Sequence, residues 1–279
     1  MRQTTLRRLS NMGKYVEVES GVNIYVEDVG QGRPVIFLHG WPLDSRMFEY
    51  QYMRLPAQGF RCIGIDARGF GKSDAPWDGY TYDRYADDVR AVIDSLGLED
   101  AILVGFSMGG ATAVRYAARH QGHGISKLLL LGAAAPSFTV RDGVPDAMKV
   151  EDVNEQIIQP TLEDRPKMVA SFGKMLTYKK PSSSSSTWVE MVAFQASAVG
   201  TLRAAEMLRD EDLRDDLAKI TVPTAIFHGE KDEICPYGLA QAMHAGIATS
   251  HIVTFEKSGH AMMMDEPEKF NEELVAFLR

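Results

Sequence analysis

Ser107 lies at the centre of the sequence GFSMG, residues 105–109, which has the pattern G-x-S-x-G. The apolar run 101–105 precedes it and an alanine-rich stretch, 109–120, follows it, which predicts a turn between a buried strand and a helix. So tight a turn strains its central residue and leaves no room for side chains two positions away. Ser107 is therefore predicted to be a nucleophile at the carboxyl edge of a sheet, the alternative being an ordinary glycine-rich helix start.

A serine hydroxyl is a weak nucleophile near neutral pH and needs a general base beside it. Among the seven histidines, His260 lies on a loop just past the apolar run 251–255, at the sheet edge where the serine is expected. His39 and His228 also end apolar runs, and we expect the first to anchor a loop and the second to pack. The sequence therefore predicts His260 as the base.

The base in turn needs a carboxylate that orients its ring. Asp232 follows the apolar run 223–229, and Glu230 and Glu233 lie close to it in the sequence. We favour Asp232 because the chain order serine, aspartate, histidine is the one that accompanies this serine pattern. A surface carboxylate without a catalytic role is the alternative for Asp232.

Negative charge that develops on a substrate oxygen requires N–H donors. The backbone N–H of Met108 is one candidate, because the first residues of a helix have free N–H groups at the positive end of its dipole. The backbone N–H of Trp41 is the second candidate, on a loop that Gly40 allows to turn. Pro42 has no N–H and stiffens that loop. The indole of Trp41 would serve packing.

Short, continuous apolar runs recur along the chain between more polar stretches. Runs of this length are typical of strands that are buried on both faces of a parallel sheet. They lie at 34–40, 60–65, 101–105, 127–132, 223–229 and 251–255.

Amphipathic helices are predicted between these runs. In 82–96 apolar residues recur at a spacing of three and four, with Thr81 as the N-cap and Gly97 as the stop. A last helix is expected over 267–278. The stretch 14–30 alternates polar and apolar residues, which predicts a hairpin at the sheet edge. Alternating strands and helices indicate an α/β fold with right-handed crossovers.

The strand pattern stops between 137 and 215, where amphipathic stretches, prolines and scattered aromatic residues replace it. We expect a helical cap over 137–215, inserted into a core made of 14–136 and 216–279. The serine run at 182–187 is predicted to be a low-complexity loop. The first residues, 1–13, are basic without an apolar segment, so we expect a disordered lead-in or a remnant of cloning rather than a secretory signal.

The composition of the 279 residues is that of an ordinary globular protein, with 45% hydrophobic residues and a net charge of −8. An acidic chain argues against nucleic acid or an anionic membrane as the main partner. Cys62 and Cys235 are too few for a disulfide framework and form no metal-binding pattern. A reducing, cytoplasmic location and buried thiols are therefore expected.

Five motifs, taken together and in order, make the chain resemble the α/β-hydrolase superfamily from residue 14 onward. Within it, the chain looks most like the cofactor-free (non-haem) haloperoxidase and aryl esterase branch. The resemblance implies an eight-stranded, mostly parallel sheet with helices on both faces and a helical cap over a Ser–His–Asp site. The motifs are HGWP (39–42), DARGFGKSD (66–74), GFSMGG (105–110), HGEKDEICP (228–236) and SGHAMMMDEP (258–267).

The expected function is that of a serine hydrolase that cleaves small carboxylic esters through an acyl-enzyme and needs no cofactor. The resemblance also implies perhydrolase activity, in which hydrogen peroxide and a carboxylic acid give a peracid. A C–C bond hydrolase or lactonase with the same triad is one alternative, and a ligand-binding homologue without catalysis is another. Dehalogenase chemistry is disfavoured because it needs a carboxylate at position 107. The sequence leaves the physiological ester and any homo-oligomer open.

Overall fold

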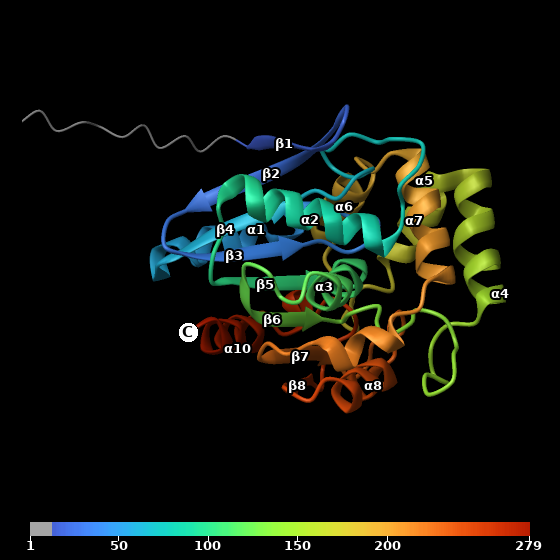
Figure 1. The fold of residues 1–279 in the computed structure, drawn as a ribbon. Coiled ribbons are helices and arrows are strands. Elements are labelled where there is room, and N and C mark those ends of the chain that lie inside the picture. The colour runs from blue at the N-terminus through green and yellow to red at the C-terminus, as the bar shows by residue number, and fades with distance from the viewer. Residues whose placement is uncertain (1–12) are drawn as a thin grey trace, which may run out of the picture.

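The computed structural model describes residues 13–279, which form one eight-stranded sheet in the order β1-β2-β4-β3-β5-β6-β7-β8 (Figure 1). The first two strands form an antiparallel hairpin at one edge, and β2 is also antiparallel to β4, whereas all other neighbours are parallel. The prediction of an eight-stranded, mostly parallel sheet is confirmed. The predicted lead-in lies outside the described residues except for Gly13. The strands are β1 (Lys14–Glu19), β2 (Val22–Gly30), β3 (Arg33–Leu38), β4 (Phe60–Ile65), β5 (Ala101–Phe106), β6 (Ile125–Leu131), β7 (Thr224–Gly229) and β8 (Ser250–Phe255).

Helices cover both faces of the sheet. On one face Phe37 packs against Phe48 and Tyr52, and Phe227 packs against Phe270, which brings α1 and α10 to that side. On the other face α2 and α3 pack against each other and against the sheet. These helices are α1 (Glu49–Arg54), α2 (Tyr82–Leu96), α3 (Met108–Arg119), α8 (Tyr237–Gly246), α9 (Met262–Asp265) and α10 (Pro267–Leu278), with short helices η1 (Ser45–Phe48), η2 (Pro56–Gln58) and η4 (Arg214–Lys219).

The bounds of α2 follow from its end residues, as the sequence predicted. The Thr81 side chain accepts a hydrogen bond from the backbone N–H of Arg84, which satisfies one of the free donors in the first turn. At the other end Gly97 adopts the left-handed conformation, with φ of 58°. Local sequence chemistry is therefore enough to start and stop this helix.

Between β6 and β7 the chain forms a helical insertion, residues 150–210. Figure 1 shows α4, α5 and α7 beyond the carboxyl ends of the parallel strands, on the side where the sequence predicted a site. The insertion consists of α4 (Val150–Val153), η3 (Asn154–Ile158), α5 (Gln159–Gly173), α6 (Ser183–Ala193) and α7 (Ala198–Asp210).

The serine run is helical, so the prediction of a loop at 182–187 is wrong. Helix α6 begins at Ser183, and the hydroxyl of Ser182 accepts the backbone N–H of Ser185 as an N-cap. Serine is a good N-cap but a weak helix former, so the composition of the serine run alone predicts a loop. The buried side chains of Val189 and Val192 further along α6 stabilise the helix through packing.

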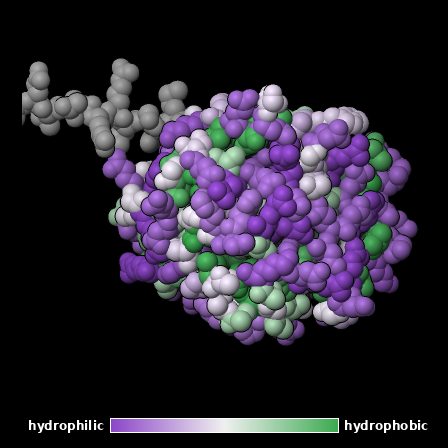
Figure 2. Space-filling model, in the orientation of Figure 1, coloured by the Kyte–Doolittle hydropathy of each residue, from purple (hydrophilic) through white to green (hydrophobic). Residues whose placement is uncertain are grey.

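The surface seen in Figure 2 is largely hydrophilic, with small scattered apolar areas. Among the helices of residues 13–279, none is both long enough and apolar enough to span a bilayer.

Candidate active site

Ser107 occupies the turn between β5, which ends at Phe106, and α3, which begins at Met108. Its backbone has φ of 54° and ψ of −117°, a strained conformation for a residue other than glycine. A Cβ atom on Gly105 would lie 2.3 Å from the carbonyl oxygen of Gly109, and one on Gly109 would lie 2.3 Å from that of Leu38. The glycines of the motif are therefore required by close backbone approach.

Asp232 and His260 form a buried pair at the carboxyl ends of β7 and β8. The His260 Nδ1–H donates to Asp232 Oδ2 over 2.7 Å, and only 1% of His260 is exposed. Asp232 Oδ1 accepts the backbone N–H groups of Ile234 and Cys235, each at 2.9 Å. The carboxylate is thus fixed on one side and directed at the imidazole on the other, whereas the rival carboxylates that follow β7 are exposed.

His260 lies beside the serine turn. Its ring is 4.7 Å, centroid to centroid, from that of Phe106, and a Cβ on Gly132 would lie 3.2 Å from its Nδ1. The backbone N–H of Ser107 donates to the carbonyl of Leu131, which joins the turn to the end of β6. Within residues 13–279 no hydrogen bond joins the Ser107 hydroxyl to the imidazole. Such nucleophile-to-base contacts are often loose until a substrate is bound.

The two candidate oxyanion donors flank the serine. Within the described residues, the backbone N–H groups of Trp41 and Met108 donate to no protein atom. A Cβ on Gly40 would lie 3.0 Å from the Cβ of Ser107, so this loop touches the nucleophile directly. The Trp41–Pro42 peptide bond is cis. In the described part of the chain, neither N–H group is therefore already bound by a protein acceptor.

The other two histidines at strand ends have structural partners. His39 Nε2 accepts the backbone N–H of Ala67 over 3.0 Å, so it anchors a loop as expected. His228 is fully buried, and its Nε2 lies 2.6 Å from the carbonyl oxygen of Cys235. Burial lowers the pKa of His228, so its neutral form is favoured. The expectation that His228 merely packs missed this bond to the turn that holds Asp232.

A small inner cavity of about 10 Å³ adjoins Ser107. Apart from Ser107 it is apolar, and the helical insertion contributes much of its wall. Its walls include Trp41, Phe138, Ile157, Phe172 and Leu208. A space of this size holds about one water molecule or methyl group.

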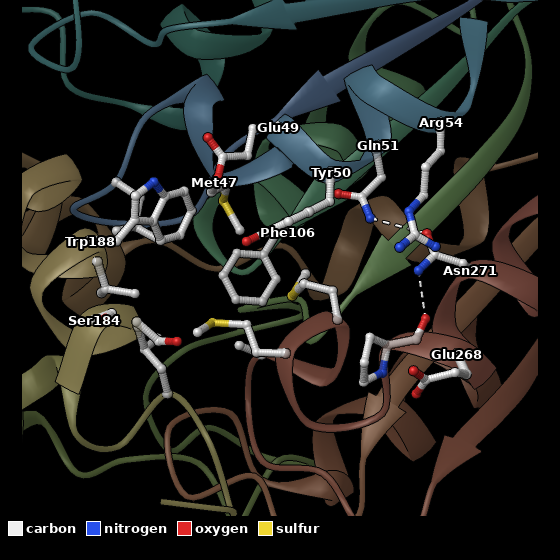
Figure 3. A pocket seen from close by; sticks show the side chains of 18 residues that line it. Met47, Glu49, Tyr50, Gln51, Arg54, Phe106, Ser184, Trp188, Glu268 and Asn271 are labelled. Carbon is white, nitrogen blue, oxygen red and sulfur yellow. Dashed lines mark hydrogen bonds between the residues drawn. The ribbon is translucent and has the colours of Figure 1, made fainter. Parts of the chain in front are cut away.

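A larger outer cavity of about 540 Å³ begins on the far side of Phe106. Figure 3 shows the Phe106 ring at its centre, with Met47 and Trp188 on one side and Asn271 on the other. The wall combines core residues with residues of the insertion, and Ala261, next to the imidazole, belongs to it. The outer cavity thus reaches the residues next to the serine and the imidazole, Phe106 and Ala261.

No cluster of three or more histidine, cysteine or acidic side chains that could bind a metal ion occurs within residues 13–279. Both cysteines are buried free thiols, and burial raises the pKa of Cys62 to about 12. The thiolate form, which acts as nucleophile and metal ligand, is therefore disfavoured at Cys62.

The chain has clear similarity to characterised proteins along most of its length. A family model described as the alpha/beta hydrolase fold matches residues 33–267. The chain is 51% identical to the AB hydrolase superfamily protein YisY of Bacillus subtilis, over 95% of this chain and 99% of that protein. It is 32% identical to the non-heme chloroperoxidase CPO-A1 of Kitasatospora aureofaciens, over 92% of this chain and 96% of that protein.

One solved structure has a closely similar fold. The esterase EaEST of Exiguobacterium antarcticum superimposes with a TM-score of 0.93 at 48% identity, covering 95% of this chain and 99% of that one.

Proposed function

Because this chain belongs to the alpha/beta hydrolase fold family, we propose that it is a serine hydrolase that cleaves small carboxylic esters through an acyl-enzyme. The resemblance inferred from the sequence motifs, to esterases and non-haem haloperoxidases, is confirmed. The observation that carries the proposal is the buried Asp232–His260 pair beside the strained turn of Ser107.

The first half-reaction forms the acyl-enzyme. His260 Nε2 takes the proton from the Ser107 hydroxyl, whose oxygen attacks the ester carbonyl carbon. The N–H groups of Trp41 and Met108 donate to the resulting oxyanion. Asp232 stabilises the imidazolium through Nδ1–H. The C–O bond to the alcohol then breaks, and His260 returns its proton to the departing alkoxide.

The second half-reaction releases the acid. His260 takes a proton from water, the hydroxide attacks the acyl carbon, and the bond to Ser107 breaks as the serine oxygen is protonated. The products are the carboxylic acid, the alcohol and the free enzyme.

The two cavities suggest how an ester is divided between them. The inner cavity adjoins Ser107 and suits a short acyl group such as acetyl, because it has room for about one methyl group. The outer cavity, lined by Met47, Trp188 and Phe106, suits a larger apolar or aromatic alcohol. Segment 137–215 would act as a cap on a core of 14–136 and 216–279, because its residues close both cavities.

A second activity, perhydrolysis, is supported by the similarity to a non-heme chloroperoxidase. Hydrogen peroxide would replace water in the second half-reaction, so that the acyl group leaves Ser107 as a peracid. The Trp41 carbonyl, which precedes Pro42, would accept a hydrogen bond from the peroxide. The peracid would then oxidise halide.

The proposal is tested by following the hydrolysis of p-nitrophenyl acetate, and the formation of peracetic acid and water from acetic acid and hydrogen peroxide, for the wild type and Ser107→Ala in parallel. Both activities should disappear in the variant, and activity that persists would refute the assignment. Lactones and vinylogous diketones in the same panel separate the lactonase and C–C hydrolase alternatives. A fluorophosphonate that fails to label wild-type Ser107 would favour a homologue without catalysis.

A further inference from the structure

The loop that carries His260, residues 256–261, is held between two other parts of the chain. On one side a Cβ on Gly229, at the end of β7, would lie 2.0 Å from the carbonyl oxygen of Gly259. On the other side a Cβ on Gly259 would lie 2.8 Å from the backbone nitrogen of Tyr178. Tyr178 belongs to the connection between α5 and α6, residues 174–182. The histidine loop is thus in backbone contact with the helical insertion.

The carboxylate of Asp265 joins the loop to this connection. Asp265 Oδ2 accepts the backbone N–H groups of Gly259, over 2.9 Å, and Tyr178, over 2.8 Å. Asp265 Oδ1 accepts the backbone N–H of Lys179 over 2.9 Å. Only 3% of Asp265 is exposed, so these bonds are shielded from water. One side chain therefore fixes the residue before His260 and two residues of the insertion.

Two further hydrogen bonds reinforce the same junction. The Lys179 Nζ donates to the backbone carbonyl of Asp265 over 2.5 Å. The backbone N–H of Ala261 donates to the carbonyl of Leu176 over 2.6 Å. The bonds at Asp265 and Ala261 thus hold the loop on both sides of the imidazole-bearing residue.

We infer that Asp265 is a positioning residue for His260, which it acts on through Gly259 and the 174–182 connection rather than through contact with the reacting atoms. The inference rests on the proposed function of His260 as the base. Asp232 restrains the ring only at Nδ1, so the distance from Nε2 to Ser107 also depends on where the loop backbone lies. A displacement of about 1 Å at such a site lowers the rate by about 100-fold.

The junction also touches the outer cavity, because Leu176 and Ala261 both line it. An alcohol group in that cavity would contact the insertion and the histidine loop at once. Asp265 therefore couples the wall of the substrate site to the placement of the base.

The test compares Asp265→Ala and Asp265→Asn with Glu266→Gln. Glu266 is the matched control, because its carboxylate binds the backbone N–H of Lys257 and the hydroxyl of Ser258 within the loop and makes no bond to the insertion. The readouts, per folded molecule, are kcat, the pH profile of kcat/KM and the rate constant for fluorophosphonate labelling of Ser107. We expect kcat and labelling to fall about 10- to 100-fold in Asp265→Ala, and clearly less in Glu266→Gln.

A purely structural role would lower the melting temperature of the Asp265 variants and leave kcat and the labelling rate of the folded fraction within about twofold of wild type. That result overturns the inference. If Asp265→Ala does not fold, Asp265→Asn decides, because it keeps the side-chain shape but presents an amide N–H₂ to backbone donors.

Amide hydrogen exchange separates this inference from the proposed function. In the Asp265 variants we expect the amides of 176–179 and of the histidine loop to lose protection together, whether or not the protein turns over an ester. Loss of protection in one segment alone would overturn the coupling. A wild-type protein that is not labelled at Ser107 would refute the function but leave this measurement intact.

Discussion

The indole Nε1–H of Trp41 donates a hydrogen bond of 2.9 Å to the backbone carbonyl of Thr201. Trp41 belongs to the loop after β3 that carries a candidate oxyanion donor, and Thr201 lies in the first turns of α7. The same helix end is held by the loop after β4, where the backbone N–H of Ser197 donates to the carbonyl of Gly69. The insertion is therefore attached to the oxyanion loop by the side chain of the residue whose backbone is the proposed donor.

Trp41→Phe should lower kcat for p-nitrophenyl acetate by about 3- to 10-fold, because it removes one hydrogen bond worth about 0.5–1.5 kcal/mol. The phenylalanine ring can keep the edge-on packing against Phe172, whose ring lies 5.0 Å from that of Trp41. Trp77→Phe is the matched control, since Trp77 is 65% exposed and lines neither the inner nor the outer cavity. The measurement is the steady-state kinetics of both variants. A kcat for Trp41→Phe equal to that for Trp77→Phe would contradict the prediction.

Asp232→Asn should lower kcat by about 10³- to 10⁴-fold while the fold is retained. The amide oxygen would keep the two backbone N–H groups of Ile234 and Cys235, so the N–H₂ group would face His260 Nδ1. The ring would then carry its proton on Nε2 and could not accept one from Ser107. Circular dichroism and active-site titration provide the control, and Glu233→Gln, at an exposed neighbour, should behave as wild type.

The parallel core and the site motifs could be predicted because each depends on local chemistry. Buried runs, the Thr81 cap and the Gly97 stop specify their own elements. Gly109 and the turn at Ser107 depend on backbone contacts that the G-x-S-x-G pattern encodes by itself. Strand ends of a parallel sheet then bring the predicted serine, aspartate and histidine to one edge.

What the sequence could not predict depends on contacts between distant segments. Nothing local indicates that the indole of Trp41 reaches Thr201, or that Asp265 binds the connection before α6. The serine run became helical because of buried residues later in α6, so tertiary packing overrode composition. The bond from His228 to Cys235 was missed for the same reason, since a histidine before glycine fits several roles.

Ile157→Ala should extend the acyl chains that the protein accepts. Ile157 is buried and lines the inner cavity beside Ser107, and its truncation adds space equal to about three methyl or methylene groups. The ratio of kcat/KM for p-nitrophenyl butyrate to that for the acetate should rise about 10-fold or more, because each buried methylene contributes about 0.8 kcal/mol. The matched control is Ile158→Ala, one residue along and outside the cavity wall. A ratio that rises equally in both variants, or in neither, would place the acyl group elsewhere.

His228→Gln should make stability less dependent on pH below about 7. Burial lowers the folded-state pKa of His228, which Asp232 opposes and His260 reinforces, from the ordinary value of about 6.5. Between the lowered pKa of the folded state and the ordinary value of about 6.5, the unfolded chain binds a proton at this residue that the folded protein does not. The contribution to the free energy of unfolding is therefore full above about pH 6.5 and is lost as the pH falls through the folded-state pKa. For one proton the slope is at most about 1.4 kcal/mol per pH unit. The His228 ring packs edge-to-face with the ring of Tyr237 and lies beside the carboxylate of Asp232.

Urea unfolding of wild type and His228→Gln between pH 5.5 and 7.5 measures this slope directly. Glutamine has an N–H₂ group that can reach the Cys235 carbonyl, so the variant should keep the bond and lose only the titration. His120→Gln is an informative second variant, because burial also lowers the pKa of His120, and its share of the slope should add to that of His228 since the two lie in separate parts of the fold. If the free energy of unfolding of His228→Gln changes with pH as steeply as that of the wild type, His228 is protonated alike in the folded and unfolded states. The assignment of a neutral imidazole to His228, behind Asp232, would then be wrong.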